Sequence, residues 1–308
     1  MATVQIFDLA NRAPAQLLQI SDLTRSHCIS KKFAEKYNHK QLWVWSIRKN
    51  NYVGVAMQFI DSAQNRRFKQ WKKLLTLKER KQQKKFVVEG FHLIEEALKA
   101  GVVFELVLGE LADMPVTWDV KNIPTFRMSE QLAKQLSETV TSQNVFAICH
   151  NREVKVDWSD IDSALVVDNV QDPGNLGTLI RTADAAGVQA VVLGQGCADV
   201  HNGKVLRGTQ GSIFHLPIIT GVDLQQEIPA LKAAGITVFG TAITNGKSVF
   251  ALNKPGKFAL VVGNEGSGVT EEVLTIADEN LYVPIHGQAE SLNVAVATGV
   301  LLYQLLNN

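Results

Sequence analysis

The sequence predicts an α/β protein built around a mainly parallel sheet, with a second, smaller α/β domain ahead of it. From Ala164 onward, short apolar runs alternate with helical segments, an order typical of parallel strands joined by crossover helices. Glycines follow the predicted strands, at the edge where ligands bind in such sheets. A shorter alternation of the same kind lies between residues 59 and 150, and the polar stretch 151–162 separates the two parts.

Three segments therefore differ in character: 1–58, 59–150 and 151–308. The first carries no motif and no clean periodicity, although Ala13–Leu23 has a helix-like composition. Met57 would be a natural beginning for the segment that follows. We interpret residues 1–58 as an extension of unknown role, and our hypothesis is that a start codon has been assigned too far upstream.

Composition excludes several classes of protein. The chain has 308 residues, of which 46% are hydrophobic and 20% charged, as in soluble globular proteins. Its three cysteines are far apart and form no C-x-x-C pair, which argues against a disulfide framework or a zinc site and fits a reducing compartment. No apolar run approaches the roughly 20 residues of a membrane helix, and no secretory signal is recognisable. We expect a cytoplasmic protein that binds neither membrane nor metal.

Local patterns justify the predicted elements in chain order. Apolar, β-branched runs indicate strands, glycines after helical segments indicate left-handed caps, and serines before them indicate N-caps. In the smaller domain we expect strands at 86–89, 104–108 and 145–149 and helices at 91–100 and 129–137. In the larger domain we expect strands at 164–167, 190–193, 214–219, 237–241, 258–262 and 281–283, a helix at 176–186 and a closing helix at 291–306.

A basic run opens the smaller domain. Ten cations lie between residues 66 and 85, opposed only by Glu79, and Trp71 and Phe86 lie among them. Such a run is most often a solvated helix face, but with aromatic residues interleaved it favours a phosphate-bearing partner, RNA or DNA. The residues that we expect to contact nucleic acid are Arg66, Arg67, Lys72, Lys73, Lys84 and Lys85.

Three polar loops follow predicted strands of the larger domain. The first leads into a helix and carries Asn175 and Arg181. The second, V-G-N-E-G-S-G, fits neither a Walker A loop nor a dinucleotide loop, and the carboxylate of Glu265 would repel a phosphate. The third carries Ser291 and Asn293 just before the last helix. Taken singly, each loop also fits an ordinary turn, and Ser291 fits a helix N-cap.

Together the three loops resemble the signature motifs of the SpoU (TrmH) branch of the SPOUT methyltransferases. They read D-x-V-x-D-P-G-N-x-G-T-x-I-R-T-A-D, V-V-G-N-E-G-S-G and V-P-I-x-G-x-x-E-S-L-N-V-A-V-A. This match covers residues 160–308, about half of the chain. Residues 60–150 resemble the RNA-binding domain that precedes the catalytic domain in many relatives and is itself similar to a ribosomal protein.

The resemblance implies a fold, a reaction and a cofactor. The fold would be an α/β domain with a C-terminal trefoil knot, working as a homodimer. The reaction would transfer a methyl group from S-adenosylmethionine to a ribose 2′-hydroxyl of RNA. The cofactor would lie against the segments around Thr241, Gly263, Val283 and Leu292.

The resemblance also implies catalytic roles. Arg181 would be the central catalytic residue, either as a general base or as a cation that orients RNA phosphate and stabilises the developing alkoxide. Asn175 and Glu265 would hold Arg181 and its loop, while Ser291 and Asn293 would contact the hydroxyl.

Other functions remain open at this stage. Ribosomal RNA of the 23S type is the first choice of substrate because of the appended RNA-binding domain, and transfer RNA is the alternative. A non-catalytic RNA-binding or ribosome-assembly protein could keep the same fold. A nucleotide-dependent dehydrogenase is disfavoured because no G-x-G-x-x-G loop occurs.

Overall fold

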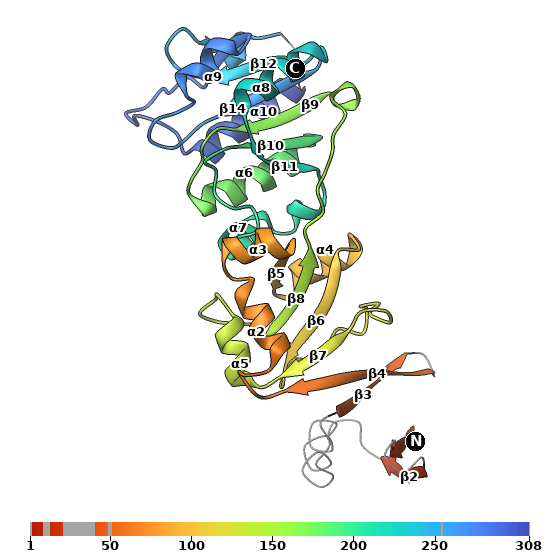
Figure 1. Ribbon diagram of the computed structural model, residues 1–308. Helices are drawn as coiled ribbons and strands as arrows, with labels where there is room; N and C mark the ends of the chain where they lie inside the picture. The colour runs from red at the N-terminus through yellow and green to blue at the C-terminus, as the bar shows by residue number, and fades with distance from the viewer. Residues whose placement is uncertain (1, 9–12, 21–40, 49–50, 254, 308) are drawn as a thin grey trace. The chain divides into compact units, whose positions relative to one another are not determined.

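The computed structural model describes residues 2–8, 13–20, 41–48, 51–253 and 255–307 (Figure 1). The chain divides into two compact units, Met1–Phe59 and Ile60–Asn308.

The first unit contains two antiparallel strand pairs. Strand β1 (Ala2–Asp8) pairs with β2 (Ala13–Ile20), and β3 (Gln41–Arg48) pairs with β4 (Asn51–Ile60), which ends at the first residue of the second unit. The helix-like interpretation of Ala13–Leu23 is therefore wrong for its first eight residues, and the last three lie outside the described residues. Pairing with β1 satisfies the backbone groups of β2 and overrides a weak local preference.

The second unit begins with an amino-terminal lobe, residues 60–150. Its strands lie in the order β7-β6-β8-β5, with β6 and β7 parallel and the other neighbours antiparallel. The strands are β5 (Lys85–Glu89), β6 (Val103–Gly109), β7 (Thr125–Met128) and β8 (Val145–His150). The helices are α2 (Arg66–Lys73), α3 (Leu77–Gln83), α4 (Phe91–Lys99) and α5 (Glu130–Leu136). Strand β7 was not predicted, because four residues that include a buried arginine carry no apolar pattern.

The aromatic residues of the basic run belong to the core. Trp71 is 2% exposed and donates through Nε1 to Glu105 Oε2 at 2.7 Å, and Phe86 is 3% exposed. Our interpretation of these two rings as part of a nucleic-acid surface is therefore wrong. Helix α2 turns Phe68 and Trp71 inward because they are three residues apart, which leaves its cations on the opposite face.

The carboxyl-terminal lobe, residues 163–307, contains a seven-stranded sheet in the order β11-β10-β9-β14-β12-β15-β13. Every neighbouring pair is parallel, which confirms the predicted fold class. The strands are β9 (Ser163–Val167), β10 (Ala190–Gly194), β11 (Ile218–Val222), β12 (Thr237–Thr241), β13 (Lys247–Ser248), β14 (Phe258–Val262) and β15 (Glu279–Tyr282). The helices are α6 (Pro173–Ala186), α7 (Gly203–Thr209), α8 (Leu224–Ala233), α9 (Glu271–Ile276) and α10 (Val294–Asn307).

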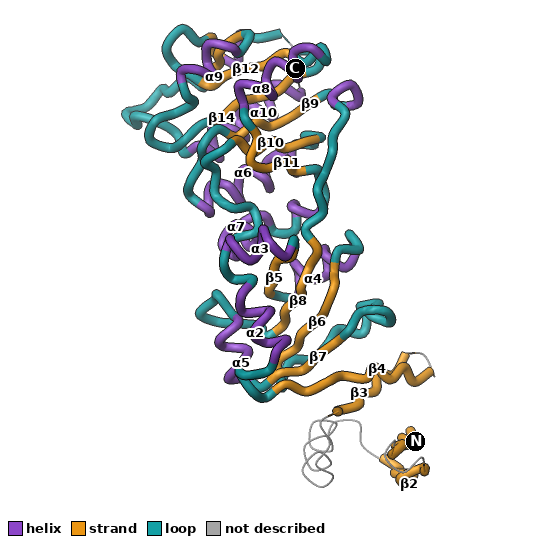
Figure 2. Tube along the Cα trace, in the orientation of Figure 1, coloured by secondary structure: helices purple, strands orange, loops and turns teal. Residues whose placement is uncertain are grey.

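Helices cover both faces of this sheet (Figure 2). In β9, Leu165 and Val167 pack in a cluster with residues of α6 and α10, whereas Ala164 and Val166 pack in a second cluster with residues of α8 and α9. Alternate residues of one strand therefore enter two separate cores, which is why the whole of β9 is apolar. Among the described residues, no helix is long and apolar enough to cross a membrane.

Several predicted boundaries in this lobe are wrong: α6 begins at Pro173, three residues earlier than expected, and β15 begins at Glu279, two residues earlier. The strand expected at 214–219 begins only at Ile218, because a 3-10 turn, Ser212–Phe214, follows the left-handed Gly211. The last helix begins at Val294, three residues later than expected. Its cap is Asn293, whose Oδ1 accepts from the backbone N–H of Ala295 at 2.9 Å and so takes the role that we expected of Ser291.

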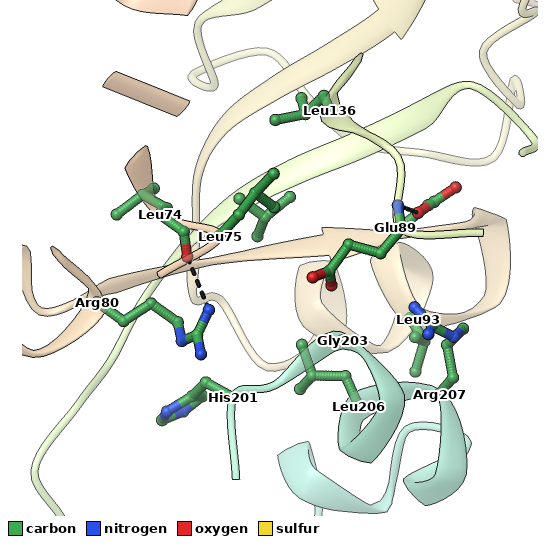
Figure 3. Close-up of a pocket in the computed structure, with 12 residues that line it drawn as sticks. Leu74, Leu75, Arg80, Glu89, Leu93, Leu136, His201, Gly203, Leu206 and Arg207 are labelled. Carbon is green, nitrogen blue, oxygen red and sulfur yellow. Dashed lines mark hydrogen bonds between the residues drawn. The ribbon is translucent and has the colours of Figure 1, made fainter. Parts of the chain in front are cut away.

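Ionic and aromatic contacts join the two lobes of the second unit. Arg80 of α3 is 8% exposed; its Nε donates to Asp199 Oδ2 at 2.8 Å and its Nη1 to the carbonyl oxygen of Leu74 at 2.9 Å. The Phe86 ring lies 4.1 Å from that of His201, and burial lowers the pKa of His201 to about 4. Arg80 and His201 border a small pocket lined by both lobes (Figure 3). Arg80 is thus committed to structure, although it lies within the basic run.

His215 forms a second contact between the lobes. Its Nδ1 lies 2.7 Å from Asp184 Oδ2 of α6, and its Nε2 lies 3.1 Å from Glu96 Oε2 of α4. Only a doubly protonated ring can donate to both carboxylates. The hydrogen bond with Asp184, followed by that with Glu96, raises the pKa of His215, and hydrogen bonds from Lys99 and then His215 lower the pKa of Glu96.

We predict that the stabilising effect of His215 depends on pH. Because its pKa is raised in the folded state, the contribution is complete below the unfolded value of about 6.5 and is lost as pH rises through the folded value. His215→Ala should therefore lower the free energy of unfolding in urea more at about pH 5.5 than at about pH 8.5. An equal loss at both pH values would contradict the prediction.

Candidate active site

The three polar loops meet at one edge of the parallel sheet. Strands β9, β14, β12 and β15 are neighbours in this order, and all run in the same direction. The segments that follow them must therefore emerge side by side at the carboxyl edge, where ligands bind in such sheets. The first, second and third polar loops follow β9, β14 and β15, respectively.

A chain of hydrogen bonds joins the three loops. Asn293 donates through Nδ2 to Asn175 Oδ1 at 2.9 Å, and Asn175 donates through Nδ2 to Glu265 Oε1 at 2.8 Å. Asn175 is the third residue of α6, and its backbone N–H is held by Oδ1 of the N-cap Asp172 at 2.8 Å. Three residues that lie far apart in the sequence thus form one exposed polar cluster.

The second loop is a tight turn that can hold only glycine at its first position. The N–H and C=O groups of Asn264 bond those of Gly268 at 3.0 and 2.9 Å, so that a Cβ on Gly263 would collide with the backbone of Gly268. Oδ1 of Asn264 accepts from the N–H of Gly266 at 2.9 Å, and its Nδ2 donates to the carbonyl oxygen of Asn169 at 3.0 Å. Sequence reasoning missed Asn264, although an asparagine between glycines is a typical turn former.

Asp168 is a second residue that sequence reasoning missed. It directly follows the buried strand β9, is 6% exposed and accepts through Oδ2 from both the N–H and the Oγ1 of Thr270, at 2.8 and 2.9 Å. Thr270 is the N-cap of α9. The first loop is therefore fixed to the second by Asn264 on one side and by Asp168 on the other, which gives the exposed cluster a rigid base.

Arg181 does not join this cluster. Its side chain is exposed and, within the described residues, makes no hydrogen bond or ion pair. Within this chain, the hydrogen bonds of Asn175 and Glu265 link them to each other and to Asn293, and none reaches Arg181. Arg181 lies six positions after Asn175 on α6, so the two side chains leave the helix about 120° apart in direction and about 9 Å apart along its axis. Ser291 is also exposed, and no hydrogen bond joins it to the described part of the cluster.

The residues expected to contact the cofactor lie at the same edge. Thr241 is the last residue of β12, and Gly263 and Val283 directly follow β14 and β15. Leu292, which is 39% exposed, precedes Asn293. These surroundings fit S-adenosylmethionine in two respects. The space beside the backbone of Gly287 is open, because a Cβ built there would meet no atom within 4 Å. The exposed carboxylate of Glu265 attracts a sulfonium cation. The described residues contain no group of three or more side chains that could hold a metal ion.

The residues expected to bind RNA separate into two places. Arg66, Lys72 and Lys73 lie on exposed positions of α2, and Lys72 and Lys73 line a shallow groove together with Gln135. Arg67 instead pairs with Glu105 and lies 4.6 Å above the ring of Phe126.

The second place is the beginning of β5. Lys84 pairs with Glu153 at 2.6 Å, and the Nζ of Lys85 lies 3.2 Å from the ring centroid of Phe104. The candidate RNA contacts therefore lie on two different elements, α2 and the beginning of β5.

Comparisons with known proteins agree with this geometry. Residues 162–303 match the SpoU rRNA Methylase family, and residues 65–147 match the MRM3-like substrate binding domain. The chain is 48% identical to the 23S rRNA (guanosine(2553)-2'-O)-methyltransferase RlmP of Bacillus subtilis, across 81% of this chain and 99% of that protein. It is 30% identical to an uncharacterized tRNA/rRNA methyltransferase of Synechocystis, across 80% and 92%.

Solved structures agree as well. The AdoMet-bound rRNA methyltransferase from Sinorhizobium meliloti superposes with a TM-score of 0.73 at 28% identity, covering 82% of this chain and 98% of that chain. The SpoU methyltransferase AviRb from Streptomyces viridochromogenes, in complex with AdoMet, superposes with a TM-score of 0.70 at 29% identity, covering 79% and 98%.

We predict that the polarity of the Asn175–Glu265 hydrogen bond can be reversed. Asn175→Asp would place two carboxylates in contact and should weaken S-adenosylmethionine binding about tenfold, the equivalent of one charge-assisted hydrogen bond. Adding Glu265→Gln supplies an amide donor opposite the new carboxylate and should recover most of the affinity. Calorimetric titration of both variants would measure this; an Asn175→Asp variant that binds like the wild type would contradict the prediction.

Proposed function

The chain belongs to the SpoU rRNA methylase family, and from that premise we propose that it methylates the ribose 2′-hydroxyl of one guanosine in 23S ribosomal RNA. The observation that carries this proposal is the hydrogen-bonded chain Asn293–Asn175–Glu265, which unites three loops at a ligand-binding edge. The relative that shares 48% identity is named for guanosine 2553 of 23S rRNA, and we propose the equivalent nucleotide as the substrate. The cell compartment that we propose is the cytoplasm, where bacterial ribosomal RNA is found.

The chemical difficulty lies with the hydroxyl, which is a poor nucleophile near neutral pH. When bound, S-adenosylmethionine supplies an electrophilic methyl group. Thr241, Gly263, Val283 and Leu292 would hold the cofactor, largely through backbone groups. Ser291 and Asn293 would orient the ribose hydroxyl, and this positioning is itself a large part of the rate enhancement.

Arg181 would act on the RNA as a cation. A guanidinium remains protonated in proteins, so a role that needs no deprotonation is favoured: it would bind the adjacent phosphate and stabilise negative charge as the hydroxyl loses its proton. Its exposed side chain, which makes no hydrogen bond or ion pair within the described residues, is available for that contact.

We infer a homodimer in which the site of one subunit uses Arg181 of the other. Two observations support this: Arg181 leaves α6 in a different direction from Asn175, and α10 exposes Val296 (55%) and Tyr303 (51%), apolar side chains that an interface would cover.

A C-terminal trefoil knot remains part of the proposed fold. The domain limits at 59, 150 and 151 also remain proposals, as do Arg66, Arg67, Lys72, Lys73, Lys84 and Lys85 as RNA contacts.

We predict that Arg181→Ala abolishes methyl transfer and spares cofactor binding. Loss of one stabilising cation at developing charge should lower kcat about 100- to 1000-fold, whereas the affinity for S-adenosylmethionine should change less than about twofold, since the residue lies away from the cofactor edge. Lys257→Ala, on the opposite edge of the sheet, is the matched control. Turnover near that of the wild type would remove Arg181 from the mechanism.

The substrate is tested by mapping ribose methylation of total RNA in a deletion strain and its parent. We expect one guanosine of 23S rRNA to lose its methyl group and to regain it when the wild-type gene, but not the Arg181→Ala gene, is restored. Loss of a transfer-RNA methyl group would instead assign the same chemistry to the alternative substrate. No change at any ribose would favour the non-catalytic RNA-binding function.

A further inference from the structure

One corner of the amino-terminal sheet combines aromatic rings with cations. Lys85, the first residue of β5, pairs with His150, the last residue of β8, and Phe104 lies on β6, the other neighbour of β8. The rings of Phe104 and His150 are 4.9 Å apart at an angle of 70°, and the Nζ of Lys85 lies 3.2 Å from the centroid of Phe104. We call these three residues the aromatic corner.

The backbone at Phe104 is irregular. Val103 pairs with Cys149 and Glu105 pairs with Ile148, so two steps along β6 match one step along β8 and Phe104 is the extra residue of a β-bulge. A bulge changes the direction of a side chain and interrupts the pairing, and bulges are frequent at functional sites. His150 is exposed and Phe104 is only partly buried, so both rings reach the surface.

Three cations and one carboxylate lie around the corner. Lys84, Lys85 and Arg152 surround it; Glu153 pairs with Lys84, and Arg152 is held by the carbonyl oxygen of Gly101 at 2.7 Å. Burial, followed by the proximity of Lys85 and Arg152, lowers the pKa of His150. The ring is therefore neutral near pH 7, and its flat face can stack without the cost of desolvating a charge.

We propose that the aromatic corner is a stacking site for an unpaired base of the RNA substrate, with Lys84, Lys85 and Arg152 binding the phosphates on either side of that base. Aromatic faces flanked by cations are how proteins hold single-stranded RNA, whereas a duplex would offer its phosphates but no free base face. The ammonium group of Lys85 covers the face of Phe104 through a cation–π contact, and a base would displace it toward a phosphate.

This inference rests on the proposed function and extends it, because it assigns the form of the RNA that the amino-terminal lobe recognises. The corner is distinct from the basic face of α2, where Arg66, Lys72 and Lys73 have no exposed aromatic partner within the described residues. Residue 150 also leads directly into the connection 151–162 to the carboxyl-terminal lobe. A base held there is thus bound where the chain passes from one lobe to the other.

The test compares the affinity of the full-length protein for single-stranded and double-stranded RNA of the same length and backbone charge. Phe104→Leu keeps apolar volume against the core and removes the aromatic face, and His150→Ser removes the second ring at an exposed position. Each should lower the affinity for single-stranded RNA about five- to tenfold and leave duplex binding unchanged. Phe91→Leu, a partly exposed aromatic of the same lobe that packs near Trp118, is the matched control.

The cations are tested by the salt dependence of binding. The double variant Lys84→Ala and Lys85→Ala should reduce the slope of log affinity against log salt by about 1.4 for single strands, the loss of two phosphate contacts, whereas Phe104→Leu should leave the slope unchanged. If the lysine variant weakens binding while both ring variants bind single strands like the wild type, the corner is a phosphate contact only and the proposal is overturned. Equal weakening on single strands and duplex would overturn it as well.

A methylation assay separates this proposal from the proposed function. With 23S rRNA as substrate, Phe104→Leu should raise KM and leave kcat unchanged, because the ring is remote from the reacting hydroxyl. If the wild-type protein fails to methylate ribosomal RNA but the ring variants still lose single-strand affinity, the substrate assignment fails and the stacking site stands.

Discussion

The arrangement of the active site depends on one side chain, the amide of Asn175. It accepts from Asn293 through its oxygen and donates to Glu265 through its nitrogen, and so satisfies one neighbour from each of two other loops. An aspartate could not donate to the carboxylate, and a serine could not reach both partners. Because the backbone N–H of Asn175 is fixed by Asp172, the amide is held by the helix as well as by its neighbours. Few other side chains could occupy this position.

This amide can organise the loops only because the sheet beneath them is rigid. Strands β9, β10 and β14 are buried at all five of their residues, with alternate side chains committed to two different cores. A slip of one residue would exchange the two faces, so the register is strongly determined. The loops are fixed to this sheet by two hydrogen bonds between them: Asn264 donates to the carbonyl oxygen of Asn169, and Asp168 accepts from the N–H of Thr270.

Local patterns were sufficient for the parallel sheet and for the polar residues that gather at its edge, because apolar runs and turn formers act over a few residues. They failed where the outcome depends on partners remote in the sequence. The sequence places Trp71 among cations and suggests a surface position. In the structure its indole N–H donates to Glu105, 34 residues away, and the ring is buried. The sequence favoured Ser291 as the cap of the last helix, whereas Asn293, which also bonds Asn175, takes that role. The direction of Arg181 followed from helix geometry, yet the motif alone suggested a bond to Asn175.

Helix α6 connects the polar cluster with the contact between the two lobes. Its first turn carries Asn175, its middle carries Arg181, and Asp184, one turn further, reaches through His215 to Glu96 of the amino-terminal lobe. The helix is braced where Gly177 approaches α7, since a Cβ there would lie only 2.8 Å from the Cα of Gly208. A stiff helix cannot move Asp184 without moving Arg181. One rigid element therefore carries both Arg181 and the contact that joins the two lobes through His215.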